Sequence, residues 1–169
     1  MFSAPDKDSS LTQGDIIDAC PVVGLSAQGS LTDLTKVSVN QWASRVIVLT
    51  QACDLVQSKT GFVLVAQIHP AEKIVHQGLL KATTIRDQVR RHQVFGWYFL
   101  PAATSPIALP EALVDLRDMH YVPRAVLEAL IAQGKRVATL LSPYREHLAQ
   151  HFAVTYMRVA LPEPYATQS

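Results

Sequence analysis

The stretch that most constrains the fold is RVIVLTQACDL, residues 45–55. Val46–Leu49 form an uninterrupted apolar run, mostly β-branched, which favours a buried strand. Hydroxyl, amide, thiol and carboxylate groups follow at once, in Thr50, Gln51, Cys53 and Asp54. A strand that ends in such groups can hold them rigidly at the mouth of a fold, so we predict a polar lip there. The alternative is that Cys53 is a small buried side chain and that Asp54 starts a turn or caps the next segment.

Charge is scarce in this chain of 169 residues: 49% of the residues are hydrophobic, only 17% are charged, and the formal net charge is +1. This composition predicts one domain with apolar surface left for a partner or a second copy, and no global field that attracts nucleic acid or a membrane. Cys20 and Cys53 do not make a disulfide framework, and the polar N-terminus contains no apolar leader. We therefore expect a cytoplasmic protein that does not enter a membrane and has no cofactor.

The apolar pattern predicts an α+β chain with a single domain over residues 14–162. A flexible arm (1–13) precedes it and a polar tail (163–169) follows it. Strands are predicted over residues 16–20, 36–39, 46–49, 62–68, 94–100, 112–116 with 120–122, and 137–141. Pro21 either ends the first strand or places it on an edge. Helical patterns cover residues 71–91, broken near Gly78 and Thr83-Thr84, then 124–133 and 144–159. A mobile loop is predicted over residues 24–33 and a turn over 57–61.

Metal and thiol chemistry are weakly indicated. His147 and His151 have the i, i+4 spacing of a zinc-binding helix, but no third ligand is near them in the sequence, so we predict no metal site. A site built from both cysteines and a histidine is an alternative. Cys53 could also pair with His120 as an activated nucleophile, although the neighbouring Asp54 opposes a lowered thiol pKa.

A basic cluster precedes an aromatic run. Its members are Arg86, Arg90, Arg91 and His92, and the aromatic residues that follow are Trp97, Tyr98 and Phe99. Basic groups beside aromatic rings can hold phosphates and stack bases, which would suit RNA. The alternative is a solvated helix end next to a core strand.

Four segments carry a resemblance to a known family. The order Gly14-Asp15-Ile16-Ile17, then RVIVLT (45–50), FVLVAQI (62–68) and LVDLRDMHYVPR (113–124) resembles the MazF/PemK-like toxins. The resemblance implies a small, strongly bent, antiparallel SH3-like β-barrel with added helices, including a C-terminal helix, and homodimers are common in that family. TQACDL and the C-terminal segment lie outside the toxin pattern and resemble uncharacterised bacterial proteins encoded beside mobile-element or phage-defence genes.

The family's catalytic pattern is not reproduced. Its ribonucleases use an arginine in the loop after the first strand, and residues 22–44 contain only Lys36. They also use Thr or Ser after the third strand, where this chain has Gln67-Ile68-His69-Pro70. Arg45, at the far end of the loop, is the nearest substitute.

Three functional hypotheses follow. The first is a non-catalytic MazF/PemK-like binding module for a protein partner, or RNA, in a toxin–antitoxin, defence or regulatory system. Its groove would be bordered by Thr50–Asp54, Arg86–His92 and His120. The second is an endoribonuclease with His120 or His69 as base and Arg45 or Arg91 stabilising charge. The third is a cysteine- or metal-dependent hydrolase centred on Cys53. The candidate catalytic residues are His120, Arg45, Cys53 and Asp54; the candidate binding residues are Thr50, Gln51, Cys53, Asp54, Arg86, Arg90, Arg91 and His92.

Overall fold

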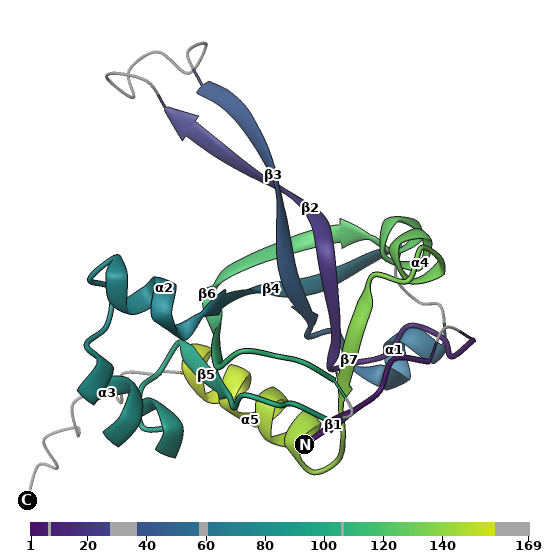
Figure 1. Ribbon diagram of the computed structural model, residues 1–169. Helices are drawn as coiled ribbons and strands as arrows, with labels where there is room; N and C mark the ends of the chain where they lie inside the picture. Colours follow the sequence, from purple (N-terminus) through teal and green to yellow (C-terminus); the bar gives the residue numbers. More distant parts are fainter. Residues whose placement is uncertain (7, 28–36, 58–60, 106, 158–169) are drawn as a thin grey trace, which may run out of the picture.

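One antiparallel sheet organises the chain, and helices cover parts of both its faces (Figure 1). The computed structural model describes residues 1–6, 8–27, 37–57, 61–105 and 107–157. Seven strands occur in the order β1-β7-β2-β3-β4-β6-β5. They are β1 (Phe2–Ser3), β2 (Asp15–Ala27), β3 (Val37–Val48), β4 (Phe62–Pro70), β5 (Trp97–Leu100), β6 (Ala112–Pro123) and β7 (Arg136–Leu140). The helices are α1 (Ala52–Val56), α2 (Ala71–His76), α3 (Ala82–Asp87), the 3₁₀ turn η2 (Val89–Arg91), α4 (Arg124–Ala132) and α5 (Tyr144–Tyr156). The α+β prediction is confirmed.

Several strands are longer than the apolar pattern predicts. Residues 37–39 and 46–48, from two predicted strands, belong to one strand, β3, whose last residue is Val48; residue 36 lies outside the described chain. β2 continues through Pro21 and takes in residues 24–27 of the predicted mobile loop; residues 28–33 lie outside the described chain. Backbone pairing with β3 extends β2, and this pairing does not depend on side-chain hydrophobicity. Pro21 is tolerated because β7 pairs with β2 only at residues 15–17, which leaves Pro21 on a free edge.

The helical segment at 71–91 is divided into α2, α3 and η2. Gly78, with φ +71°, follows α2 and gives the predicted break. The second predicted break is wrong, because Thr83 and Thr84 lie inside α3. No helix in the described part of the chain is long and apolar enough to cross a membrane.

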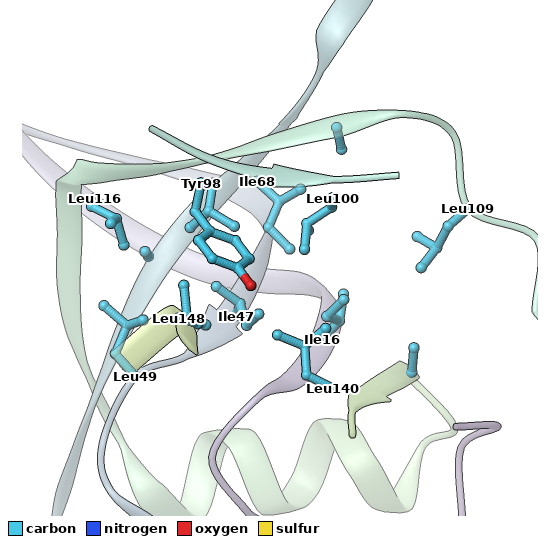
Figure 2. Close-up of a cluster of buried hydrophobic side chains, with 14 of the residues drawn as sticks. Ile16, Ile47, Leu49, Ile68, Tyr98, Leu100, Leu109, Leu116, Leu140 and Leu148 are labelled. Atoms are coloured by element: carbon cyan, nitrogen blue, oxygen red, sulfur yellow. The ribbon is translucent and has the colours of Figure 1, made fainter. Parts of the chain in front are cut away.

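The main core lies on the concave face of the sheet (Figure 2). Tyr98 and Leu100 of β5 pack in the same cluster as Leu140 of β7, although these strands are far apart in the sheet order. Leu148 of α5 packs in the same cluster (Figure 2). The sheet is therefore strongly curled, and α5 covers its concave side. It is open: within the described residues, the end strands β1 and β5 do not pair with each other.

The opposite face holds two smaller apolar clusters with polar side chains between them. Along β4, Val63 and Val65 pack with α1 and α4 in one cluster, and Ala71, at the start of α2, packs in the other. Between these points the same face of β4 carries Gln67 and His69, because alternate residues of a strand share a face. Two apolar clusters thus flank a polar strip.

Several of residues 1–6 and 8–13, in the segment that the sequence predicts as a flexible arm, contact the sheet. β1 pairs with β7, and Leu11 is buried in the cluster beneath α4. The guanidinium of Arg136 is buried and donates to the Asp6 and Ser10 carbonyl oxygens at 2.7 and 3.0 Å. It also forms a buried ion pair with Asp15 at 3.1 Å. These contacts hold the N-terminal segment against β2 and β7.

Beyond the body of the sheet, β2 and β3 pair only with each other. We call residues 20–27 and 37–44 the ribbon; it extends away from the body at the top of Figure 1. Its ladder contains eight consecutive pairs, from Cys20 with Ser44 to Ala27 with Val37. Within the described residues, no third strand joins either outer edge of the ribbon.

Candidate functional site

A connected polar cluster occupies the strip between the two smaller apolar clusters. We call it the Gln67 cluster; it contains Trp42, Ser44, Gln67, Asp118 and His120. A bulge in β6 creates it. Ala66 pairs with Met119, but Gln67 pairs with Asp115, so the intervening residues of β6 loop out and Asp118 reaches the Gln67 side chain.

Hydrogen bonds fix the orientation of the Gln67 amide. Its Oε1 accepts from Ser44 Oγ at 2.7 Å and from Trp42 Nε1 at 3.2 Å. The indole nitrogen can only donate, so the oxygen must face this side. Nε2 therefore points the other way and donates to Asp118 Oδ2. Gln67 itself is buried, and every polar atom of its side chain has a partner.

Asp118 in turn orients His120. The imidazole Nε2 lies 2.9 Å from Asp118 Oδ1. Because an ionised carboxylate only accepts, Nε2 carries the proton in that state, and the 3.2 Å contact between this nitrogen and Gln67 Nε2 is then not a hydrogen bond. Nδ1 of the neutral ring is left with a lone pair, and no described residue hydrogen-bonds to it. This nitrogen can accept a proton or a hydrogen bond from a ligand.

An indole borders the imidazole. The rings of Trp42 and His120 meet edge to face, with centroids 5.9 Å apart, and Trp42 is 40% exposed. Gly24 allows this position, because a Cβ there would lie 2.8 Å from Trp42 Cη2. The cluster thus joins an oriented imidazole to a partly open aromatic surface at the base of the ribbon.

Nearby charges are already paired. Burial lowers the pKa of His69, and the carboxylates of Asp115 and Asp118 oppose that shift. Arg117 donates through Nε and Nη2 to Asp115, at 2.9 and 3.0 Å, and its guanidinium lies 4.4 Å from the Trp97 ring centre. The arginine closest in sequence to Asp118 is therefore engaged by a carboxylate and an indole.

The residues of the predicted polar lip have different surroundings: Thr50 has a structural role, whereas Gln51 and Cys53 are exposed. Thr50 Oγ1 accepts a hydrogen bond of 2.7 Å from the Leu64 amide, which closes the end of the strand. Gln51 and Cys53 are exposed, so the alternative in which Cys53 is buried is wrong. Asp54 lies in the first turn of α1, and its side chain caps no helix end. Among the described residues, the hydrogen-bond partners of the thiol are both oxygens, Gln51 Oε1 at 3.6 Å and Asp54 Oδ1 at 3.9 Å.

The predicted catalytic partners are not brought together. Ser44 points to Gln67, so Arg45, the next residue of β3, points to the opposite face of the sheet from His120. Arg45 instead binds Asp18 through Nε and Nη2 at 2.5 and 2.8 Å, and this hydrogen bonding raises the pKa of Arg45. In the described structure, no histidine contacts the Cys53 thiol. Pairing of His120 with either Arg45 or Cys53 is therefore wrong for this conformation.

Acidic neighbours neutralise most of the predicted basic cluster. Arg86 binds Asp87 at 2.8 Å, and Arg90 binds Glu111 while its guanidinium lies 5.0 Å from the Phe99 ring centre. Arg91 is exposed. An exposed arginine and two paired ones do not make a strong phosphate-binding patch.

His92 turns inward and joins a second cluster, the histidine cluster, made of His92, Tyr98, His147 and His151. The His92 ring centre lies 4.3 Å from that of His147, 4.9 Å from that of Tyr98 and 5.7 Å from that of His151. Its Nδ1 is buried and has no hydrogen-bond partner among the described residues. Burial, reinforced by the other two histidines, lowers the pKa of His92 to about 4. In the described chain, no group of three or more His, Cys, Asp or Glu side chains has a geometry that could hold a metal ion.

Comparison with models of known protein families finds no match, and comparison with curated proteins finds none either. Neither comparison supplies a function for the Gln67 cluster.

Sequence reasoning missed most of the Gln67 cluster. Gln67 does leave a signal, because it is a polar residue inside the apolar run FVLVAQI. Trp42, Ser44 and Asp118 leave none, since their meeting depends on strand register and on the bulge in β6.

Proposed function

We propose that this protein is a non-catalytic binding module that engages a protein partner. The observation that carries the proposal is the ribbon, one face of which is apolar and open to solvent. Val23 is 54% exposed, Leu25 77% and Val39 67%. A contiguous exposed apolar surface, which none of the described residues covers, is typical of an interaction site.

A groove continues this surface toward the body of the sheet. It has a volume of about 490 Å³ and lies between the edge of β2 and one side of α4. Small and apolar residues dominate its lining: Ala19, Pro21, Ala125, Val126, Ala129, Leu130 and Gln133. The lining contains no charged residue, which suits an apolar protein segment better than an RNA backbone.

The proposal includes the MazF/PemK-like family and an SH3-like barrel. Two features support the barrel: the strong curl of the sheet, and the packing of residues from β5 and β7 in one core. The bacterial defence or regulatory setting and the cytoplasmic location are parts of the same proposal. The two unpaired thiols, Cys20 and Cys53, support the location.

Binding is preferred to catalysis because two arginines that RNA cleavage could use are occupied. Arg45 is held by Asp18 on the far face, and Arg117 is held by Asp115. Neither is therefore ready to stabilise a developing negative charge next to His120.

The test is affinity capture with three forms of the tagged protein: wild type, Leu25→Asp and Val56→Asp. Val56 is 79% exposed and lies on α1, outside the ribbon, so it is a matched control for an added charge. We expect wild type and Val56→Asp to retain the same protein and Leu25→Asp to lose it. Equal retention by all three forms would place the binding surface elsewhere.

The Asp118–His120 pair favours a second candidate function, an endoribonuclease of the toxin type. His120 Nδ1 would accept the 2′-hydroxyl proton, while Asp118 holds the ring in place. Expression in bacteria distinguishes the two functions. Growth arrest with RNA cleavage that His120→Asn abolishes would favour the nuclease, and harmless expression without cleavage leaves the binding module.

A further inference from the structure

We infer that the protein partner supplies an extended, uncharged segment, which joins the outer edge of β2 as a further strand. This inference rests on the proposed binding function and specifies how the partner is held. Three observations carry it: the direction of the backbone groups on that edge, the groove that continues it, and the lack of charge along both.

The outer edge of β2 beyond Asp18 is open to a further strand. β7 pairs with β2 only at residues 15–17, and the Asp18 amide then donates to the Lys135 carbonyl oxygen at 2.9 Å. Past this contact, no described residue forms a backbone hydrogen bond with the outer edge of residues 19–27. A row of unpaired N–H and C=O groups is a template for another extended chain.

Strand register shows which backbone groups face outward. The Gly14 amide donates to the Val48 carbonyl oxygen at 2.9 Å, so the backbone groups of Val48 face β2. Alternation along β3 turns its other even-numbered residues the same way, and they pair with residues 20, 22, 24 and 26 of β2. The backbone groups of Pro21, Val23 and Leu25 therefore point away from β3. Pro21 lacks an N–H, whereas Val23 and Leu25 each present a donor and an acceptor.

The groove and the exposed aliphatic side chains give the added strand a surface to pack on. Val23 is 54% exposed and Leu25 77%, and Pro21 shares their face because it lies an even number of residues away. Pro21 also lines the groove, together with Ala125 and Ala129 of α4. Apolar side chains at alternate positions of the added strand would therefore run along Val23 and Leu25 and enter the groove.

The opposite face of the ribbon suits small polar side chains. On that face Ser26 Oγ and Ser38 Oγ are hydrogen-bonded at 2.7 Å, and Asn40 Nδ2 donates to Ser26 Oγ at 2.9 Å. A strand beside β2 would bring its other set of side chains next to these groups, where hydroxyl groups fit. We therefore expect a segment that alternates apolar and uncharged polar residues.

The lack of charge favours an uncharged segment. Residues 19–27 contain no Asp, Glu, Lys or Arg, and neither does the lining of the groove. Edge strands commonly carry charges, prolines or bulges that prevent pairing with another chain. Here the bulge at Ala19, with φ +57°, and Pro21 both precede Val23. A charged side chain placed along the rest of the edge would lose hydration without gaining an ion pair.

Two synthetic peptides test strand addition on the wild-type protein. The probe is an eight-residue peptide of alternating valine and threonine, N-methylated at each threonine so that only one edge can pair. The control is N-methylated at every residue, which blocks both edges. In NMR spectra at millimolar peptide, we expect the probe to shift the amide signals of Val23 and Leu25 and to slow their hydrogen exchange, and the control to leave them unchanged. No response to either peptide, or an equal response to both, would overturn the inference.

A proline variant tests the hydrogen bond from the protein side. Leu25→Pro removes the outward N–H and breaks no bond to β3, so it should weaken probe binding by about tenfold. Leu25→Val keeps the N–H and should stay within about threefold of wild type. Circular dichroism confirms that both variants are folded, and equal affinities for the two would also overturn the inference. If strand addition fails but capture of a protein still depends on Leu25, the binding function stands and only the mode of binding is wrong.

Discussion

β2 and β3 each have two halves that differ sharply in their surroundings. In the body of the sheet, Ile16 of β2 and Ile47 of β3 pair with each other and are completely buried in the main core. In the ribbon, Leu25 and Val39 also pair, but water reaches both side chains. The backbone ladder is the same in both halves. What differs is the presence of other strands and helices to bury the side chains.

This difference shows that pairing and packing are separate properties. Hydrogen bonds propagate a ladder from residue to residue, whereas burial needs a third element. In the body, that third element is α5 on one face of the sheet and α4 on the other. We propose that the ribbon obtains its cover from a bound protein partner. Stability of the monomer should therefore depend on the body and hardly at all on the ribbon.

The largest effect is expected for Arg136→Met, which breaks the buried ion pair with Asp15. It leaves the Asp15 carboxylate buried without its cation and should lower the free energy of unfolding by about 3–5 kcal/mol. Urea denaturation measures the change. Arg45→Met is the control: its partly exposed pair with Asp18 should contribute less than about 1 kcal/mol. Equal losses would show that burial does not decide how much these two ion pairs contribute.

The division between body and ribbon also predicts the next largest effect, which compares two residues of β3. Ile47→Ala should lower the free energy of unfolding by about 2–4 kcal/mol, because it removes buried methyl groups and leaves a cavity. Val39→Ala should change it by less than about 0.5 kcal/mol. Both values are measured on the purified protein without a partner. A loss above 1.5 kcal/mol for Val39→Ala would mean that the ribbon packs within the monomer.

The pH dependence of the free energy of unfolding tests the histidine cluster, which lies in the body of the protein. The folded-state pKa of His92 is about 4, below its ordinary value of about 6.5. The unfolded chain therefore binds a proton first, so stability is complete above pH 6.5 and falls as the pH drops toward 4. We expect a loss on the order of 1–2 kcal/mol from this group.

His92→Asn provides the control for the pH experiment, because asparagine tolerates the left-handed backbone at this position, φ +57°, and does not titrate. The pH profile of this variant should be flatter between pH 6.5 and 4. Burial also lowers the pKa of His151, which should leave part of the slope. An unchanged profile would mean that His92 is solvated like an exposed histidine.

The smallest effect on stability is expected for Gly24→Ala, which tests the connection between the ribbon and the Gln67 cluster. The added methyl group would displace the far edge of the Trp42 indole. We expect a loss below about 1 kcal/mol but a clear change in Trp42 fluorescence, measured in a Trp97→Phe background. An unchanged spectrum would show that the indole does not rest on Gly24.

Local sequence signals predicted much of the secondary structure. The apolar run before Thr50 is buried as predicted, although its last residue, Leu49, follows the end of β3. The helix predicted over 124–133 is α4, and Gly134, with φ +75°, follows it. These predictions succeed because period and turn chemistry are properties of neighbouring residues. Whether the predicted binding lip acts as one stays a prediction.

The site itself could not be read from local signals. His120 was a candidate for its chemistry, but its partners came from a bulge in β6 and from β3. Arg45 was assigned to the same site because it follows the loop, and strand alternation turns it to the other face. The sequence could not show that the basic cluster is partly neutralised, because Glu111, which pairs with Arg90, lies 21 residues away along the chain.

By itself, the sequence determined the class of the fold, the positions of its apolar strands and the absence of charged residues from residues 20–27 and 37–44 of the ribbon. Only the tertiary structure decided which polar groups meet at Gln67, that His92 packs against α5, and that β2 and β3 continue beyond the body. Composition and period act over a few residues, whereas these contacts depend on register and on the curl of the sheet, which the whole chain sets together.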